Sequence, residues 1–260
     1  MVDFKQKEKY DINDLLEIMR LLRAPGGCPW DAQQTHMSIR KNLIEETYEV
    51  IEAIDKDDKE LMTEELGDLL MQVVFHSQME QEAGNFDFSD VTDGVCKKLV
   101  FRHPFLFGEA TGESWEELKQ HEKGQTTVTE TLDGVARSLP ALWRSEKLQK
   151  KAAKTGFSWE SVEESLDKLD EETAELRRAV ETGQDAEEEL GDVLFAAVSA
   201  AIRLNADPEQ ALHRTCEKFI RRFGAMEQAA ADAGRSLSEL TRDELLALWA
   251  LQKQAEHSKA

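Results

Sequence analysis

Carboxylate side chains recur at helical spacing in two neighbouring segments of this 260-residue chain. Glu46 and Glu49 lie three residues apart, as do Glu65 and Asp68, so each pair shares one face of a helix. If the two helices form an antiparallel hairpin, the four carboxylates converge at the edge of its apolar stripe. Two such charges about 4 Å apart repel by roughly 4 kcal/mol at an effective dielectric near 20, so the cluster needs a cation. Oxygen ligands without thiolate or imidazole favour Mg²⁺, with Mn²⁺ as the alternative, and Mg²⁺ often arrives with substrate phosphates.

The same acidic pattern occurs a second time. Residues 42–54 (NLIEETYEVIEAI) align with residues 168–180 (KLDEETAELRRAV), and residues 64–74 (EELGDLLMQVV) align with residues 188–198 (EELGDVLFAAV). A single EExxE pattern in so acidic a chain is more often a solvated helix face. Two copies, each followed by EELGD at a matching distance, favour a metal and phosphate site instead. The acids of the second copy are Glu172, Glu175, Glu189 and Asp192.

Basic and aromatic residues also recur after each acidic segment. A Lys and an Arg four apart on one helix face suit phosphate oxygens, although pairing with surface acids is the alternative. A tryptophan further along suits stacking on a nucleobase, although tryptophans that pack in a core are commoner. The residues concerned are Lys98, Arg102, Trp115 and Lys119 in the first copy and Lys218, Arg222, Trp249 and Lys253 in the second.

Helices are expected to position all of these residues. Apolar residues recur at helical spacing, as in Leu66, Leu69 and Val73, and no segment shows sustained strict alternation, so the sequence predicts an all-α fold. Short charged or Gly-containing segments at 55–59 and 182–185 are expected to join the acidic helices of each copy as antiparallel hairpins.

Small residues and polar stretches refine this picture. Gly67 and its counterpart Gly191 are expected to let the paired helices approach closely. The polar, Thr-rich stretch 125–133 reads as a linker between the copies. We therefore expect two duplicated helical-bundle domains, at residues 1–127 and 128–260.

The overall composition excludes several classes of function. Lys and Arg total 32 against 53 Asp and Glu, a formal net charge of −21, which argues against binding a nucleic-acid polymer or an anionic membrane surface. The longest nearly apolar stretch, residues 195–202, is too short to cross a bilayer. Cys28, Cys96 and Cys216 form no CxxC pair, so we expect reduced thiols in a cytoplasmic protein.

Four segments together resemble a known family: GCPWD at 27–31, EETYE at 45–49, EELGD at 64–68 and KLVFRHP at 98–104. Over essentially the whole chain the sequence resembles MazG, the two-domain nucleoside triphosphate pyrophosphohydrolases of the all-α NTP pyrophosphatase group. The resemblance implies Mg²⁺-dependent hydrolysis between the α- and β-phosphates of nucleoside triphosphates, which yields a monophosphate and pyrophosphate. It also implies a homodimer and a role in removing unwanted nucleotides.

The resemblance assigns roles to individual residues. The metal ligands fall on the four acids of each copy, and nucleotide contacts fall on Lys218, Arg222 and Trp249. Lys168 and Glu188, which begin the two aligned segments of the second copy, are further candidates for substrate binding. Glu171, or Glu45 in the first copy, is a candidate base that orients the attacking water, with a solvent-facing neighbour as the alternative.

Three other functions compete with this one. A ferritin-like di-metal bundle uses Glu-x-x-His motifs, but none of the six histidines has a Glu three positions before it. A dUTPase-like or phosphoribosyl-ATP pyrophosphohydrolase activity belongs to the same all-α group, but the duplication and the GCPWD segment weigh against both. A regulatory protein could use the acidic hairpins only to hold an ion and a nucleotide, in which case binding occurs without turnover.

Overall fold

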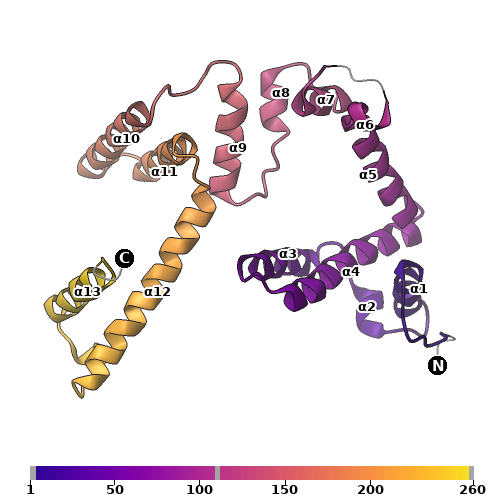
Figure 1. The fold of residues 1–260 in the computed structure, drawn as a ribbon, viewed down its shortest axis with the longest axis horizontal. Coiled ribbons are helices and arrows are strands. Elements are labelled where there is room, and N and C mark those ends of the chain that lie inside the picture. Colours follow the sequence, from indigo (N-terminus) through magenta and orange to yellow (C-terminus); the bar gives the residue numbers. More distant parts are fainter. Residues whose placement is uncertain (1–3, 109–111, 258–260) are drawn as a thin grey trace. The chain divides into compact units, whose positions relative to one another are not determined.

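The computed structural model describes residues 4–108 and 112–257, and these residues form helices joined by turns and loops, without any strand (Figure 1). The predicted all-α fold is confirmed. The chain divides into two compact units, Met1–Lys119 and Gln120–Ala260. The predicted boundary between the two copies of the repeat, after residue 127, stays a prediction.

Most of the described residues lie in helices. In the first unit these are α1 (Ile12–Arg23), α2 (Pro29–Gln33), α3 (Arg40–Asp55), α4 (Lys59–Ala83), α5 (Phe88–Arg102), α6 (Pro104–Phe107) and α7 (Trp115–Glu122), the last of which runs across the boundary. The second unit contains α8 (Val128–Asp133), α9 (Ala141–Ala153), α10 (Val162–Thr182), α11 (Ala186–Arg203), α12 (Pro208–Asp232), the short 3₁₀ helix η1 (Leu237–Glu239) and α13 (Arg242–His257). No helix in the described part of the chain is long and apolar enough to span a membrane.

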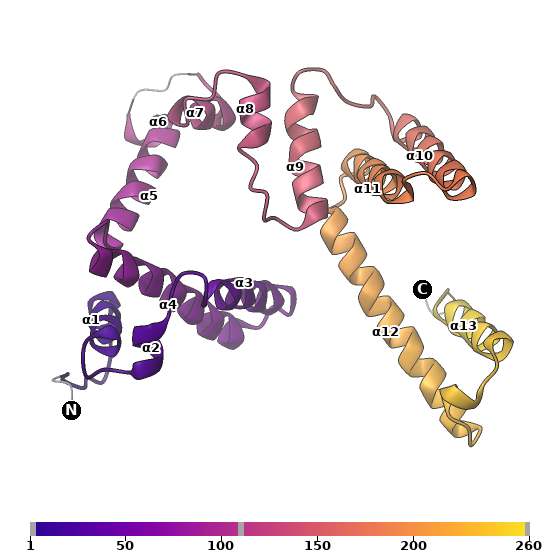
Figure 2. The same ribbon diagram turned by 180° about the vertical axis from the view of Figure 1, so that it is seen from behind.

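The two acidic segments form helical hairpins, as the sequence predicts. Helices α3 and α4 lie side by side, and so do α10 and α11 (Figures 1 and 2). In the first hairpin the Asp58 carboxylate caps α4 by accepting hydrogen bonds from the N–H groups of Glu60 and Leu61. In the second, Gly183 ends α10 at a φ of 68°, a left-handed conformation that glycine adopts without strain.

The stretch 125–133 is not wholly a linker, because residues 128–133 form α8. Thr127 caps this helix: its side chain accepts a hydrogen bond from the Glu130 N–H, while the Glu130 carboxylate accepts one from the Thr127 N–H. Such a reciprocal capping box starts a helix even in a polar, Thr-rich segment. Helix α8 packs against α9, the first long helix of the second unit.

The first unit has a dense core between α1 and α4. Met19, Ile39, Val74, Phe75 and Met79 are each at most 8% exposed and pack together. This core fixes the position of α4, which carries part of the first acidic group.

Helices α12 and α13 of the second unit form another pair, which lies side by side in both views (Figure 2).

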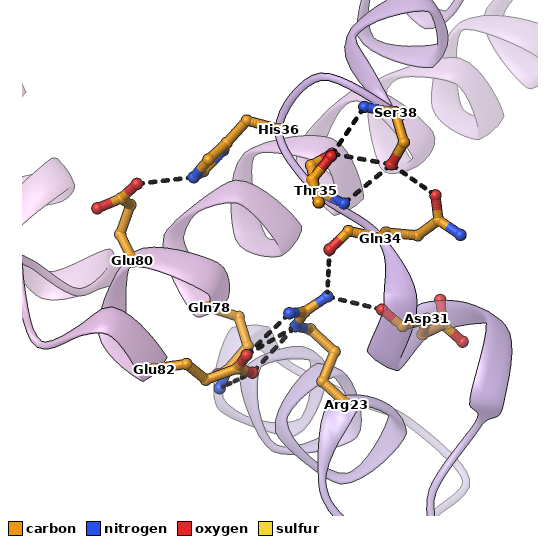
Figure 3. A network of polar contacts seen from close by, with 9 residues as sticks. All are labelled: Arg23, Asp31, Gln34, Thr35, His36, Ser38, Gln78, Glu80 and Glu82. Carbon is orange, nitrogen blue, oxygen red and sulfur yellow. Dashed lines mark hydrogen bonds and ion pairs between the residues drawn. The ribbon is translucent and has the colours of Figure 1, made fainter.

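A network of polar contacts holds the loop that leads into α3 (Figure 3). Arg23 donates hydrogen bonds from Nη1 to the carbonyl oxygens of Asp31 (2.6 Å) and Gln34 (3.3 Å). Its Nη2 and Nε bind the Glu82 carboxylate of α4 at 2.8 and 3.0 Å, and this contact lowers the pKa of Glu82. His36 Nε2 lies 2.7 Å from Glu80 Oε1, also on α4. Two side chains of α4 therefore fix the loop from which the acidic helix α3 starts.

We predict that Arg23→Ala lowers the stability of the first unit by about 2 kcal/mol, because it removes the hydrogen bonds that one buried side chain donates to the Asp31 and Gln34 carbonyl groups and to the Glu82 carboxylate. The Arg23 side chain is only 7% exposed, so water replaces these contacts poorly. Calorimetric melting should show a lower Tm for the first unit.

Arg20→Ala is the matched control. Arg20 lies one turn earlier on α1 and pairs with Glu17, but both side chains are largely exposed. Such a pair contributes little, so its loss should change stability by less than about 0.5 kcal/mol. Equal effects of the two substitutions would contradict the role given to Arg23.

Candidate metal and nucleotide site

The first hairpin brings three carboxylates together. Glu46 and Glu49 of α3 and Glu65 of α4 each offer an oxygen atom, and these oxygens all lie within 4.8 Å of one another. Burial raises the pKa of Glu46, and the charges of Asp68 and Glu49 raise it further. Burial and then the charge of Glu49 raise the pKa of Glu65. Like charges held this close favour a proton or a cation between them.

The second hairpin repeats the arrangement with one change of ligand. Glu172 of α10 and Glu189 and Asp192 of α11 place their oxygens within the same 4.8 Å limit. Glu172 is buried, with 8% of its surface exposed. Burial and then the charges of Glu175 and Asp192 raise the pKa of Glu189. We call the two groups the first triad (Glu46, Glu49, Glu65) and the second triad (Glu172, Glu189, Asp192).

One predicted acid of each copy lies outside its triad. Asp68 raises the pKa of Glu46 through its charge but is not part of the first triad. Glu175 acts on Glu189 in the same way, while its own carboxylate accepts a hydrogen bond from Arg178 Nη2 at 2.9 Å. The eight predicted metal ligands thus form two groups of three, each with a fourth acid close enough to affect it electrostatically.

Lys168 distinguishes the second triad from the first. Its ammonium lies 2.7 Å from Glu172 Oε1 and 2.9 Å from Glu171 Oε1, and these hydrogen bonds raise the pKa of Lys168. The aligned position in the first copy is Asn42, which carries no charge. Of the other candidate residues beside the triads, Glu45, Glu171 and Glu188 are exposed.

The predicted basic and aromatic residues form matching contacts in the two copies. The guanidinium of Arg102 lies 5.1 Å from the centre of the Trp115 ring, and that of Arg222 lies 5.7 Å from the Trp249 ring. These are cation–π contacts. Arg222 is also buried and donates from Nε to Glu256 Oε2 at 2.7 Å, so its charge already has a partner within the chain.

The lysines of this group are more accessible. Lys98 and Lys253 are exposed, Lys218 is half-buried, and the ammonium of Lys119 lies 4.9 Å from the Trp115 ring. Contacts of these residues with phosphate or base stay predictions.

The prediction that Gly67 and Gly191 let the paired helices approach closely is wrong for the single chain. A Cβ atom built at either position would meet no atom within 4 Å, because both glycines face open space rather than the partner helix of the hairpin. The hairpins therefore pack without needing glycine there. Glycine in a helix costs about 1 kcal/mol relative to alanine, so these two residues are unfavourable in the isolated hairpin.

The sequence did not reveal a pocket beside the second triad. This cavity has a volume of about 560 Å³, and Lys168, Glu172 and Asp192 are among its lining residues. Most of its wall is apolar and comes from α9, the loop after it and α11. The sequence does contain one indication of this pocket. One residue beyond the aligned EELGD segments, the first copy has Phe75 and the second has the much smaller Ser199.

Comparison with known proteins points to one family. The family model of the MazG nucleotide pyrophosphohydrolase domain matches residues 34–107 and 160–224, and each range contains one triad. A Thermotoga maritima protein named nucleoside triphosphate pyrophosphohydrolase/pyrophosphatase MazG is 42% identical over 239 residues, covering 91% of this chain and 93% of the relative. The nucleoside triphosphate pyrophosphohydrolase of Escherichia coli K12 is 41% identical over 257 residues, covering 94% and 98%. An uncharacterized Bacillus subtilis protein, YabN, is 40% identical over 95% of this chain but only 52% of its own length.

We predict that Glu189→Gln raises the Tm of the metal-free protein at neutral pH. The raised pKa of Glu189 means that its ionised form opposes folding, so stability is lost as the pH rises through that pKa. Removing the charge relieves this repulsion, and the gain should shrink as the pH falls through the raised pKa of Glu189, where its carboxylate takes up a proton. Melting curves in chelator at several pH values measure the effect.

Glu187→Gln serves as the control, because Glu187 is exposed, lies in the same first turn of α11 and belongs to neither triad. Its substitution should leave the Tm unchanged or slightly lower, since an acid near a helix N-terminus is mildly favourable. A Glu189→Gln protein that melts below wild type at neutral pH would refute the repulsion argument.

Proposed function

The chain belongs to the family of MazG nucleotide pyrophosphohydrolases, and we propose that it hydrolyses nucleoside triphosphates between the α- and β-phosphates. It is a hydrolase that acts on acid anhydrides, as its curated relatives are. The products of the proposed reaction are a nucleoside monophosphate and pyrophosphate, and the proposed role is the removal of unwanted nucleotides. The main support for this reaction is the second triad, in which three carboxylates converge with a lysine beside them.

The donor set supports Mg²⁺ as the cofactor, with Mn²⁺ as the alternative. Every residue in both triads offers a carboxylate oxygen, and Mg²⁺ and Mn²⁺ both bind such hard oxygen ligands well. The raised pKa of Glu46, Glu65 and Glu189 also fits groups that share a cation, because mutual repulsion weakens once positive charge lies between them. Bound there, the ion would neutralise charge on the triphosphate and position it.

The residues around the second triad have distinct proposed roles. Lys168 binds phosphate oxygens or the nucleoside, since its ammonium lines the pocket 2.7 Å from Glu172 Oε1. Glu188 and Lys218 contribute to substrate binding. Arg222, Trp249 and Lys253 form the outer part of the nucleotide contact, with Lys98 and Arg102 in the equivalent positions of the first copy.

In the proposed reaction a water molecule attacks the α-phosphorus. The oxygen of water forms the new P–O bond, the bond from the α-phosphorus to the bridging oxygen breaks, and pyrophosphate leaves with that oxygen. Glu171 orients the water and accepts its proton, and Glu45 does so in the first copy. Glu171 is exposed and bound to Lys168 at 2.9 Å, so it is accessible to solvent next to the second triad.

We propose a homodimer in the cytoplasm. Leu166 and Val180 of α10 and Leu190 and Leu194 of α11 are exposed although they lie on the hairpin that carries the second triad. Exposed apolar residues on one surface often mark a subunit interface. The three cysteines are free, which fits a reducing compartment.

We predict that sedimentation equilibrium yields twice the chain mass of 29.5 kDa, and that Leu190→Glu shifts the protein toward the monomer. A buried charge without a partner strongly disfavours the assembled state. Glu187→Gln, on the same helix, removes a charge instead of adding one and should not change the mass. Monomeric wild-type protein at micromolar concentration would contradict the dimer.

We predict that Glu172→Gln lowers kcat by about 10²-fold or more, the scale of losing one preorganised charged group. The assay incubates the protein with a panel of ribo- and deoxyribonucleoside triphosphates and Mg²⁺ and resolves monophosphate, diphosphate, pyrophosphate and orthophosphate. Equimolar monophosphate and pyrophosphate, lost on chelation, are expected.

Glu46→Gln is the matched control, because Glu46 holds the aligned position in the first triad. Its effect on kcat measures the share of the first copy. Diphosphate and orthophosphate as products would exclude α–β cleavage. Wild-type turnover in the double variant would exclude both triads, and nucleotide binding without turnover would favour a regulatory protein.

A further inference from the structure

Helices α12 and α13 are joined by one acidic side chain near the end of α13. Glu256 Oε2 accepts a hydrogen bond from Arg222 Nε at 2.7 Å, and Glu256 Oε1 accepts one from Arg221 Nε at 3.0 Å. The side chain of Arg222 is only 10% exposed, whereas that of Arg221 is 65% exposed. The hydrogen bond from Arg222 lowers the pKa of the Glu256 carboxylate, so this group is ionised at neutral pH. A single carboxylate therefore binds two arginines of the neighbouring helix.

An acid occurs at the equivalent place in both copies of the repeat. It stands seven residues after a tryptophan and three after a lysine, in the sets Trp115, Lys119, Glu122 and Trp249, Lys253, Glu256. Residues at this spacing lie on one face of a helix. The lysine and the tryptophan are candidate nucleotide contacts, but a carboxylate beside them repels phosphate. Its recurrence indicates that the acid acts on a neighbouring side chain and not on the ligand.

We propose that Glu256 is a positioning residue, which holds the Arg222 guanidinium so that its two terminal nitrogens face the phosphates of the bound nucleotide. The proposal rests on the proposed function and on the nucleotide contact proposed there for Arg222. Glu256 itself does not touch the nucleotide.

The contact with Glu256 leaves the terminal edge of the Arg222 guanidinium open. An arginine side chain has one N–H donor on Nε and four on its two Nη atoms. Glu256 binds only the Nε donor, and within the part of the chain that the structure describes the Nη atoms of Arg222 make no hydrogen bond. Neither Nη atom is among the buried polar atoms that lack a partner, so both reach solvent. Parallel N–H donors of this kind bind phosphate oxygens as a fork.

An aromatic contact fixes the same guanidinium from a second position on α13. The Arg222 guanidinium lies 5.7 Å from the centre of the Trp249 ring, and that ring lies 5.2 Å from the ring of Phe219, about one turn before Arg222 on α12. Glu256 lies about two turns beyond Trp249. A side chain that is held at two points loses less conformational entropy when a ligand binds it. Preorganised in this way, Arg222 binds phosphate more tightly.

A purely structural role for Glu256 is the alternative, in which the ion pair only fastens the end of α13 to α12. The same pair of helices has another ion pair at its opposite end. Arg235, which follows α12, donates from Nη1 to Glu244 Oε1 in the first turn of α13 at 2.6 Å. Neither residue belongs to the candidate nucleotide contacts. Glu244→Gln is therefore the matched control for Glu256→Gln.

The test measures the kinetics of pyrophosphate release by the full-length protein with Mg²⁺ and a nucleoside triphosphate. Glu256→Gln keeps the shape of the side chain and removes its charge. We expect KM to rise about fivefold or more with kcat within about twofold of wild type, because Arg222 is no longer held in place before the ligand binds. Loss of a negative charge alone would lower KM, so the direction of the change separates orientation from simple electrostatics.

The control should affect stability without affecting KM. Glu244 also accepts a hydrogen bond from the Thr241 N–H at the start of α13, so Glu244→Gln should lower the Tm at least as much as Glu256→Gln does. Its KM should stay that of wild type. Equal effects of the two substitutions on KM would assign Glu256 the structural role and overturn the proposal.

A double-variant cycle tests whether Glu256 acts through Arg222. In an Arg222→Lys protein, Glu256→Gln should leave KM nearly unchanged, because lysine has no guanidinium to orient. The same rise in KM in both backgrounds would overturn the proposal. Arg221→Gln separates the two arginines, since Arg221 shares Glu256 but aligns with Phe101 in the first copy. It should leave KM unchanged.

A KM for Glu256→Gln equal to or below that of wild type would also overturn the positioning role. Calorimetric titration with adenosine α,β-methylenetriphosphate, which the proposed reaction cannot cleave, keeps the two proposals apart. Weaker binding of this analogue by Glu256→Gln but not by Glu244→Gln, without pyrophosphate release by wild type, would overturn the proposed function alone. No binding of the analogue by wild type would overturn both.

Discussion

Repulsion between carboxylates on paired helices is the constraint on which the rest of this structure depends. Each hairpin places three acidic oxygens within 4.8 Å of one another, and burial and neighbouring charge raise the pKa of Glu46, Glu65 and Glu189. The first hairpin tolerates this repulsion because it is fixed elsewhere: the core around Phe75 holds α4, and the contacts of Arg23 hold the loop before α3. Rigid helices thus maintain a site that is unfavourable without a cation.

The two copies of the repeat fill the interior of the same helical arrangement differently. Both keep the acids and a cation–π contact between an arginine and a tryptophan. They differ in the interior, where Phe75 and Gln72 give way to Ser199 and Ala196, and beside the triad, where Asn42 gives way to Lys168. The first copy gains a packed core from its large side chains. The second gives up that packing and has a cavity next to its acids.

The sequence predicted the features that depend on local periodicity and on repetition. Spacing of three residues placed the acids on common helix faces, and short turns predicted the hairpins, because both follow from helix geometry. Features that depend on contacts distant in the sequence were not predictable: the pairing of Arg222 with Glu256, the open space at Gly67, and the pocket beside Glu172. Helix α8 lies between these cases, since the capping box of Thr127 and Glu130 is visible in the sequence but the surrounding polar residues favoured a linker.

We propose that each triad binds a divalent cation between its two helices. The decisive experiment is a titration of the metal-free protein with Mn²⁺, followed by electron paramagnetic resonance of the free ion. Binding should be saturable and should weaken as the pH falls, because protons and the cation compete for the same oxygens. Binding should also be lost when Glu46 and Glu172 are both changed to Gln. Equal Mn²⁺ binding by this double variant and wild type would show that the triads do not hold the ion.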